Sequence, residues 1–468
     1  MIAILQMACI LQVISIINKL FFIQVQIFIM NNQPHSIKAF MIAAPKSASG
    51  KTTITLGLLN ALRRKNIHVR AAKSGPDYID PAFHAIATQN TSFNLDSWAM
   101  PFPLLDHLFN ASTKSAELFI IESSMGFLDG IENEEGKRGC GADLAIRYKI
   151  PIILVLDITG QAQSAAAIAY GFANINPKFK ILGVILNNVA SPRHYQNTKA
   201  AFDRINIPIL GSVPRNSKLH LPTRHLGLIQ AEEHEDLDNH LDFLADFIEE
   251  NIDLDKLLSY IPQLSIPSDN SIIALPPLGQ RIAIARDLAF SFIYPHILDG
   301  WHRQGASIHF FSPLQDEAPS EKCDSCWLPG GYPELYAEKI ANANQFLQGL
   351  QNFAQTKTVH GECGGYMVMG KSLIDKNGQA HRMSGLLSHS CSYAKPKIHL
   401  GYRIARLPNQ NGDLTIYGHE FHYATISDPG SDQPYALLSD GTDNYLGPEG
   451  GRRNKVTGCF FHSIALKS

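Results

Sequence analysis

The chain has 468 residues, of which 45% are hydrophobic and 18% charged, and its formal net charge is −2, as is typical of a soluble globular protein with enough apolar material for two domains. No dense run of lysine and arginine is present, so nucleic-acid partners are not expected. The seven scattered cysteines argue against a disulfide framework and favour a reducing cytoplasm.

The first 37 residues are expected to lie outside the fold as an N-terminal extension. Residues 1–29 are largely apolar, but Gln, Asn and Lys19 interrupt them. A membrane-spanning helix needs about 20 apolar residues in a row, and a signal peptide begins with basic residues. Met30 follows directly, which favours translation starting there; a peripheral membrane-associated helix and a signal peptide are the alternatives. Stable membrane insertion is not expected.

From Lys38 onward, short apolar runs alternate with amphipathic stretches. "AFMIAAP" predicts a buried strand, and "TTITLGLLNALRRK" has apolar residues at helical spacing. Further buried strands are predicted at "HVRAAKSG", "LFIIESS", "IPIILVLDI" and "KILGVILNNV", with helical segments between most of them. Such runs are typical of a parallel sheet covered on both faces, so residues 38–230 are expected to form a doubly wound α/β domain.

The rest of the chain predicts a connecting segment and a second domain. Residues 231–279 are acidic and helical at first and then rich in proline and serine, which predicts a helical tail and a linker. A second alternating set of strands and helices begins at "RIAIARDLAFSF" and continues to the C-terminus. The fold class is therefore α/β with two domains, and residues 280–468 form the second one.

The segment "PKSASGKT" (residues 45–52) lies between the first predicted strand and the first predicted helix. It matches the phosphate-binding pattern GxxxxGK[ST], except that proline replaces the first glycine. Its glycine lets the backbone approach phosphate, its lysine neutralises the β and γ charge, and its threonine hydroxyl can bind Mg²⁺. Asn187 could read the adenine edge, with helix capping as the alternative. The predicted ATP-binding residues are Ser49, Gly50, Lys51, Thr52, Thr53 and Asn187.

Three acidic clusters follow predicted strands, at the edge where ligands bind in open α/β sheets. They contain Asp77 and Asp80 in "KSGPDYIDP", Glu122 and Asp129 in "ESSMGFLDG", and Asp157 in "LVLDITG". An enzyme with a phosphate-binding loop needs carboxylates to hold Mg²⁺ and to orient the acceptor. Helix capping and turn closing are the alternatives, above all for Asp157. The predicted Mg²⁺ ligands are Thr52, Asp77 and Glu122.

The segment "HGECGGYMVMG" (residues 360–370) places Cys363 in a glycine-rich turn after a predicted strand. A nucleophilic cysteine needs an exposed turn, backbone N–H groups for an oxyanion and a nearby base. A second glycine pair in "LPGGYPE" suggests an oxyanion hole formed by the amides of Gly331 and Gly364. A helix starting after the turn is expected to lower the pKa of the thiol. The candidate bases are His419, His422 and His462.

Taken together, these segments resemble a known family. "PKSASGKT", "GPDYIDP", "MGFLDG", "ARDLAFSFIYP", "LPGGYPE", "HGECGGYM", "GYR" and "GHEFHY" occur in this order. From residue 39 to 468 the chain resembles the cobyrinate a,c-diamide synthases, glutamine-dependent amidotransferases of corrinoid biosynthesis. The resemblance implies a domain similar to dethiobiotin synthetase followed by a class I glutaminase domain. It also implies that Cys363 is the nucleophile, that His462 increases its nucleophilicity, and that His419 and Glu420 have an architectural or interdomain role.

The reaction implied by the resemblance uses a corrinoid carboxylate, L-glutamine and ATP. ATP with Mg²⁺ would phosphorylate the a- and c-carboxylates, and ammonia from glutamine would reach them through an internal passage and displace phosphate. Asp77, Tyr78 and Asp129 are the predicted substrate-binding residues. A homodimer is the assembly that we consider.

Several alternatives remain at this level. The same chemistry could act on hydrogenobyrinate or on a nickel sirohydrochlorin. A P-loop ATPase acting as a switch would explain the first domain but not the two glycine turns of the second. A glutaminase-like module with a dead site predicts the loss of Cys363 or His462, and both are present. One departure from the family pattern is Ala48 in place of glycine, which fits phosphate binding if its φ is negative.

Overall fold

The fold is taken from a computed structural model, which describes residues 36–219, 223–224, 227–228, 230–233, 236–267, 274–408 and 414–467. The N-terminal extension up to residue 35 and residues 268–273 of the predicted linker lie outside the described residues. Among the described helices, none has both the length and the apolar character that a bilayer crossing requires.

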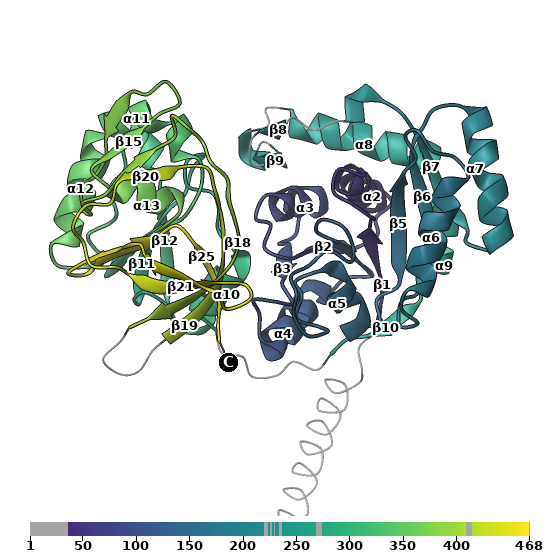
Figure 1. The fold of residues 1–468 in the computed structure, drawn as a ribbon, viewed down its shortest axis with the longest axis horizontal. Helices are drawn as coiled ribbons and strands as arrows, with labels where there is room; N and C mark the ends of the chain where they lie inside the picture. Colours follow the sequence, from purple (N-terminus) through teal and green to yellow (C-terminus); the bar gives the residue numbers. More distant parts are fainter. Residues whose placement is uncertain are drawn as a thin grey trace, which may run out of the picture.

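The first domain is built on an eight-stranded sheet with the order β3-β2-β4-β1-β5-β6-β7, and β10 pairs with β1 beside this path (Figure 1). Its strands are β1 (Ser36–Ala43), β2 (Val69–Ser74), β3 (Phe93–Leu95), β4 (Leu118–Glu122), β5 (Ile152–Asp157), β6 (Ile181–Val189), β7 (Ile209–Pro214) and β10 (Gln263–Ser265). All neighbours run parallel except β1 and β10. The strand order changes direction at β1, and the carboxyl end of such a strand is where ligands bind.

The helices of this domain cover the sheet because its central strands are buried on both sides. β4 is buried along its whole length and β5 along all but its last residue, as expected for a parallel sheet between two helical layers. The helices are α2 (Lys51–Arg64), α3 (Asp80–Thr88), α4 (Phe102–Thr113), α5 (Gly141–Arg147), α6 (Ser164–Asn174), α7 (Pro192–Ile205), α8 (Leu237–Asn251) and α9 (Leu254–Tyr260).

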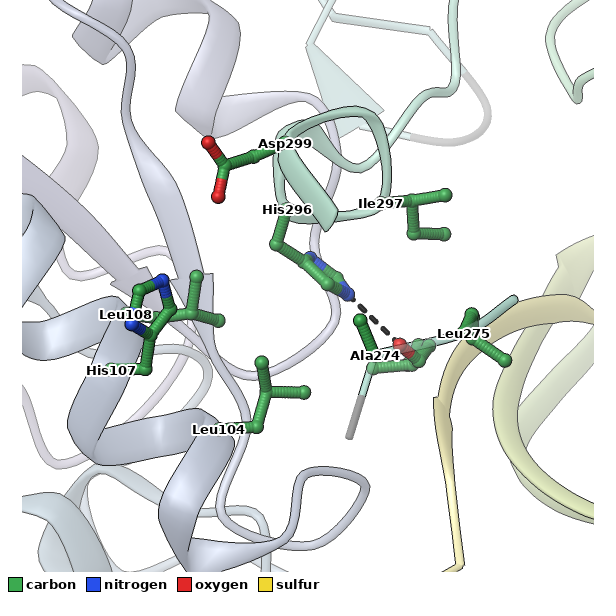
Figure 2. Close-up of a pocket in the computed structure, with 9 residues that line it drawn as sticks. Leu104, His107, Leu108, Ala274, Leu275, His296, Ile297 and Asp299 are labelled. Atoms are coloured by element: carbon green, nitrogen blue, oxygen red, sulfur yellow. Dashed lines mark hydrogen bonds between the residues drawn. The ribbon is translucent and has the colours of Figure 1, made fainter. Parts of the chain in front are cut away.

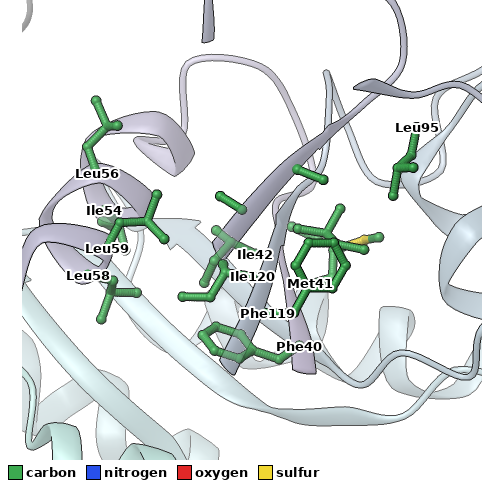
Figure 3. Close-up of a cluster of buried hydrophobic side chains, with 14 of the residues drawn as sticks. Phe40, Met41, Ile42, Ile54, Leu56, Leu58, Leu59, Leu95, Phe119 and Ile120 are labelled. Atoms are coloured by element: carbon green, nitrogen blue, oxygen red, sulfur yellow. The ribbon is translucent and has the colours of Figure 1, made fainter. Parts of the chain in front are cut away.

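Helix α2 packs between the sheet and the predicted helical tail, and its buried side chains form the core there. Figure 3 shows Ile54 and Leu58 of α2 near Phe40 and Ile42 of β1, and all four side chains are buried. On its other side α2 contacts α8 closely, since a Cβ at Gly57 would lie 2.5 Å from Cγ1 of an α8 isoleucine. The helical tail therefore packs as part of the first domain.

The second domain has a six-stranded sheet with the order β12-β11-β13-β14-β24-β23. Its strands are β11 (Arg281–Ala285), β12 (Ser307–Phe311), β13 (Ser325–Leu328), β14 (Thr358–Glu362), β23 (Gly451–Arg453) and β24 (Val456–Cys459). The helices are α10 (Pro295–Arg303), α11 (Ala337–Asn342), α12 (Asn344–Ala354) and α13 (Gly364–Met369). All strand pairs run parallel except β23 with β24. The predicted α/β class of both domains is confirmed.

Two smaller sheets complete the second domain, and the five-stranded one faces the first domain. The five-stranded sheet has the order β22-β21-β18-β19-β25, and the four-stranded sheet has the order β16-β15-β17-β20. The strands are β15 (Ser372–Ile374), β16 (Ala380–Arg382), β17 (Ser390–Ser392), β18 (His399–Leu407), β19 (Leu414–His422), β20 (Thr425–Asp428), β21 (Ala436–Asp440), β22 (Tyr445–Glu449) and β25 (His462–Leu466). A short hairpin, β8 (Thr223–Arg224) with β9 (Gly227–Leu228), belongs to the first domain.

The two domains meet along a seam of aromatic and hydrogen-bonded contacts. Trp98 stacks on Tyr402 with ring centroids 4.3 Å apart, and its Nε1–H donates to a backbone carbonyl of the second domain at 3.1 Å. The Tyr402 hydroxyl donates to Asp96 Oδ2 at 3.0 Å. Figure 2 shows a further part of the seam, where Leu104 and Leu108 of α4 face His296 of α10 around a cavity of about 10 Å³. The seam holds the carboxyl edge of the first sheet against the second domain.

Candidate functional site

The phosphate-binding loop ends at Gly50, which has φ 94° and precedes the first residue of α2. A Cβ at Gly50 would lie 2.2 Å from Asn187 Nδ2, and this amide donates to Ser49 O at 2.9 Å. Asn187 therefore supports the backbone of the loop from β6. The Ser49 hydroxyl donates to Lys46 O at 3.0 Å, so it too acts within the loop.

Ala48 adopts φ 59°, in the left-handed region that glycine prefers. The condition of a negative φ, under which alanine was expected to fit here, is therefore not met. The local backbone of the loop requires a conformation that costs an alanine about 1 kcal/mol or more.

Lys51 is buried, and its ammonium group donates to two backbone carbonyls. The acceptors are Met125 O at 2.5 Å and Lys46 O at 3.4 Å. Burial, together with the nearby charge of Lys73, lowers the pKa of Lys51 to about 8. A bound phosphate would replace these carbonyl partners and favour the charged form.

A cluster of charged groups lies directly beside Thr52. The Thr52 hydroxyl donates to Glu122 Oε1 at 2.6 Å and lies 3.3 Å from Asp80 Oδ2. Lys73 Nζ, at the end of β2, lies 2.5 Å from Asp80 and 2.8 Å from Glu122. His84 Nε2 lies 2.8 Å from the other oxygen of Glu122. The hydroxyl and carboxylate oxygens that gather around the Lys73 ammonium group are a donor set that fits Mg²⁺.

Burial and pairing set the charges within this cluster. Burial opposes ionisation of Glu122, but Lys73 and then His84 hold its pKa below its usual value. Burial and Asp77 raise the pKa of Asp80, despite the neighbouring ammonium group. Burial opposes the charge of Lys73, yet Asp80 and Glu122 raise its pKa, so the lysine remains charged.

The other predicted acidic residues lie around this cluster. Asp77 lines the same cavity, and its Oδ1 accepts the backbone N–H groups of Ile79 at 2.8 Å and Asp80 at 3.2 Å. Asp129 is exposed outside the cavity lining. Asp157 Oδ1 accepts the Thr159 N–H at 2.9 Å, which agrees with the turn-closing alternative. The structure thus brings Asp80, rather than Asp77, next to Thr52 and Glu122.

Both domains line the cavity that contains the phosphate loop. Its volume is about 680 Å³. Thr52, Thr53, Tyr78 and Glu122 line it from the first domain. The lining residues from the second domain are Leu400, Tyr402, His419 and Phe421. We call this space the nucleotide cavity.

Cys363 lies at the sharp turn between β14 and α13. Its φ is 49°, and its backbone N–H donates to Cys459 O at 2.8 Å, which fixes the turn against the neighbouring strand. Burial raises the pKa of the Cys363 thiol well above its usual value, and the charge of Glu334 adds to this effect. The N–H of Gly364 at the start of α13 lowers the thiol pKa, as expected for a helix N-terminus, but desolvation of the thiolate outweighs this effect.

The two glycine turns lie against each other at this cysteine. A Cβ on Gly364 would lie 3.0 Å from Gly331 N, so the two predicted oxyanion donors are neighbours. A Cβ on Gly330 would lie 2.3 Å from His462 Cε1 and 3.3 Å from Cys363 Cβ. Gly330 therefore leaves the space in which cysteine and histidine approach each other.

Of the three candidate bases, His462 is the one placed beside Cys363. Burial lowers the pKa of His462 to about 4, so its imidazole is neutral and can accept a proton. His419 pairs with His462 across β19 and β25 and lines the nucleotide cavity instead. His422 Nε2 lies 2.7 Å from Glu420 Oε1 and is paired with that carboxylate.

Tyr78 connects the two halves of the site. It follows β2 in the first domain, and its ring lies 4.8 Å from the ring of His462 and 4.3 Å from that of Phe292. The hydroxyl of Tyr294 donates to Pro76 O at 2.7 Å, which holds the same loop. Phe292 and Tyr294 belong to "ARDLAFSFIYP", and no role was assigned to them from the sequence; their aromatic character was the available signal.

Known proteins match both halves of the chain. Residues 40–229 match the family described as CobQ/CobB/MinD/ParA nucleotide binding domain, and residues 281–468 match the CobB/CobQ-like glutamine amidotransferase domain. The hydrogenobyrinate a,c-diamide synthase of Agrobacterium fabrum is 52% identical over 433 residues, with 92% of this chain and 99% of that protein covered. The proteins of the same name from Mesorhizobium japonicum and Rhodobacter capsulatus are each 50% identical, with the same coverage of both chains.

These relatives confirm the a,c-diamide synthase family that the motifs indicated, and their names carry hydrogenobyrinate, the substrate first considered as the alternative to cobyrinate. The similarity extends over both domains, the connecting segment and both halves of the site. The chain belongs to the hydrogenobyrinate a,c-diamide synthase family.

Proposed function

We propose that the protein catalyses the ATP-dependent amidation of the a- and c-carboxylates of hydrogenobyrinate, with ammonia released from glutamine. The single observation that carries the proposal is the contact of Tyr78 with His462. It joins the loop after β2 at the nucleotide cavity to the histidine beside Cys363. This contact supports a release site and a use site for ammonia that share one seam.

The reaction begins with activation of the carboxylate. Transfer of the γ-phosphoryl group of ATP to a carboxylate oxygen gives an acyl phosphate and ADP, and this step needs charge stabilisation more than covalent help. Lys51 is placed to neutralise charge on the phosphates. Thr52, Asp80 and Glu122 would hold Mg²⁺, which supplies further neutralisation of the phosphate charge when bound. Asp77, Tyr78 and Asp129 remain the residues proposed to face the macrocycle.

Ammonia is released at the second half of the site. His462 takes the proton of the Cys363 thiol, and the thiolate attacks the side-chain amide carbon of glutamine. The amides of Gly331 and Gly364 stabilise the oxyanion, and His462 returns its proton to the amide nitrogen. The C–N bond then breaks, so that ammonia leaves a thioester, which water hydrolyses to glutamate and the free thiol. Ammonia then attacks the acyl phosphate, so that an amide and inorganic phosphate form. Burial raises the pKa of the Cys363 thiol, so the thiolate depends on proton transfer to His462.

The test is to incubate purified protein with ATP, Mg²⁺, glutamine and hydrogenobyrinic acid, and to weigh the products by mass spectrometry. The expected products carry one and then two amide groups. Cobyrinic acid in a parallel reaction tests which macrocycle is preferred. If neither macrocycle gains an amide, the proposed function is wrong.

Two variants separate the half-reactions. Cys363→Ser is expected to abolish amidation with glutamine but to retain amidation with ammonium, because only the release of ammonia is lost. Lys51→Ala is expected to abolish both, because the carboxylate is no longer activated. Glutamine-dependent turnover in Cys363→Ser would contradict the role assigned to the cysteine.

A further inference from the structure

Of the buried polar atoms without a hydrogen-bond partner among the described residues, three lie around His462 at the seam. They are Tyr78 Oη, His419 Nδ1 and His462 Nε2. Buried polar groups are almost always paired, so a group of unpaired ones indicates that a polar partner is present during function. The three residues come from two domains, so chain connectivity alone does not explain their proximity.

The three residues lie one after another in space from Cys363 to the nucleotide cavity. His462 lies beside Cys363 and contacts the ring of Tyr78. His419 is the cross-strand neighbour of His462 in the β19–β25 pair. Tyr78 and His419 both line the nucleotide cavity, whereas His462 does not. Tyr78 and His419 therefore stand between the glutaminase site and the cavity.

The chemistry of these groups suits neutral ammonia. Burial lowers the pKa of His419 to about 3, and the neighbouring His462 contributes to the shift. A neutral imidazole does not convert ammonia to ammonium, whereas an imidazolium would do so. The nearest carboxylate on β19, Glu420, is paired with Arg403 and His422, so it does not present a free charge that would retain ammonium.

Aromatic rings lie around Tyr78 and His419 and limit the entry of water between them. Phe292 stacks on Tyr78, and Tyr402 meets His419 edge-on with ring centroids 5.7 Å apart. Phe421 also lies near His419, with ring centroids 6.4 Å apart. Desolvated polar atoms between aromatic walls can hold a small neutral donor and acceptor without competition from bulk water.

We propose that ammonia crosses between Tyr78 and His419, and that His419 is a positioning residue that directs ammonia into the nucleotide cavity through its unpaired Nδ1. This inference rests on the proposed function and adds the crossing point to it. It assigns a role to the motif "GHEFHY" beyond architecture. Ammonia released at Cys363 then meets the acyl phosphate without entering bulk solvent.

The test follows the source of the amide nitrogen. The full-length enzyme receives glutamine labelled with ¹⁵N in its amide, an equal amount of unlabelled ammonium chloride, ATP, Mg²⁺ and hydrogenobyrinic acid. Mass spectrometry gives the labelled fraction of the product, and glutamate formed per amide formed gives the coupling. The variants are His419→Leu, which removes the polar atom, and His419→Asn, which keeps a neutral polar atom near the position of Nδ1.

The wild-type enzyme is expected to take nearly all product nitrogen from glutamine. His419→Leu is expected to form about fivefold fewer amides per glutamate, a change of the size expected from losing one hydrogen bond to ammonia. Its product also gains unlabelled nitrogen, and ammonium-supported amidation falls less than glutamine-supported amidation. His419→Asn restores most of the coupling. His309→Leu, at an exposed histidine on β12, is the control and is expected to behave as the wild type.

Two results would overturn the crossing point. One is His419→Leu with the coupling and label of the wild type. The other is an equal fall of glutamine- and ammonium-supported amidation, which indicates a structural role only. A wild-type enzyme that forms no amide from either nitrogen source contradicts the proposed function, and the crossing point fails with it.

Discussion

Gly330 is the residue on which the approach of histidine to cysteine depends most directly. Its own backbone is already fixed, because Gly330 O accepts the Phe292 N–H at 3.0 Å. A methyl group at this position would overlap with His462 rather than with solvent, since the hypothetical Cβ lies 2.3 Å from Cε1. No motif rule requires glycine here, so only the folded structure reveals why "LPGGYPE" needs both glycines.

Gly330→Ala is therefore expected to displace His462 and to lower kcat/KM for glutamine by about tenfold or more, since small displacements of reacting groups have such effects. Amidation with ammonium should persist, because the nucleotide cavity is unchanged. Steady-state assays with the two nitrogen sources measure the difference. Gly171→Ala on α6, where nothing lies within 4 Å of the new Cβ, is the matched control. Equal glutamine kinetics in Gly330→Ala and the wild type would refute this account.

At the scale of elements, the phosphate-binding loop was predictable because its residue types, strand and helix are local in sequence. Glycine, lysine and threonine at fixed spacing identified the loop, and the helix begins at Lys51 as expected. The backbone of Ala48 was not predictable, because its φ of 59° is imposed by the closed loop rather than by the residue's own preference. Likewise, the pairing of Lys73 with Asp80 and Glu122 joins the ends of two strands, which no local pattern specifies.

Ala48→Gly is expected to relieve the strain of the loop in its phosphate-ready shape. The left-handed conformation costs alanine about 1–2 kcal/mol, of which the greater flexibility of glycine in the unfolded chain offsets about 0.4–1 kcal/mol. We expect the KM for ATP to fall about two- to threefold and the free energy of unfolding to rise by less than about 1 kcal/mol. Kinetic assays and urea unfolding measure both quantities.

The control for this change is Asn66→Gly in the turn after α2, where φ is also positive at 59° but no ligand site is near. That variant should alter stability alone. A KM for ATP that stays constant or rises in Ala48→Gly would show that the strain of the loop does not affect nucleotide binding.

At the scale of the whole molecule, specific contacts order the seam between the two domains. The sequence predicted two α/β domains and candidate residues for each half-site, among them Lys51 and Cys363. It could not predict which surfaces meet, because Trp98 and Tyr402 are 304 positions apart in sequence, and their contact depends on the arrangement of both domains. The same reason explains why the neighbourhood of Tyr78 and His462 appears only in the fold.

Trp98→Ala is expected to weaken the docking of the domains by about 3–5 kcal/mol, as for other buried large aromatic side chains. The stacking of its ring on Tyr402 and the hydrogen bond from its N–H to Gly441 O would both be lost. Calorimetry should then show the unfolding of the two domains separated further in temperature, and the ratio of amide to glutamate should fall. Trp98→Phe retains a ring and should lose less. An unchanged unfolding profile in Trp98→Ala would contradict the importance of this contact.

The pairing of β1 with β10 has a consequence for the synthesis of the chain and for any division of its gene. Ser36 to Lys38 pair with residues 263–265, so the ribosome must release the connecting segment before the first sheet is complete. A polypeptide ending at residue 229, where the family match ends, would lack α8, α9 and β10 and would expose the face of α2 around Gly57. If the two domains were made as separate polypeptides, the division of the chain would therefore have to lie between residues 267 and 281. This is after the last strand of the first domain and before the first strand of the second.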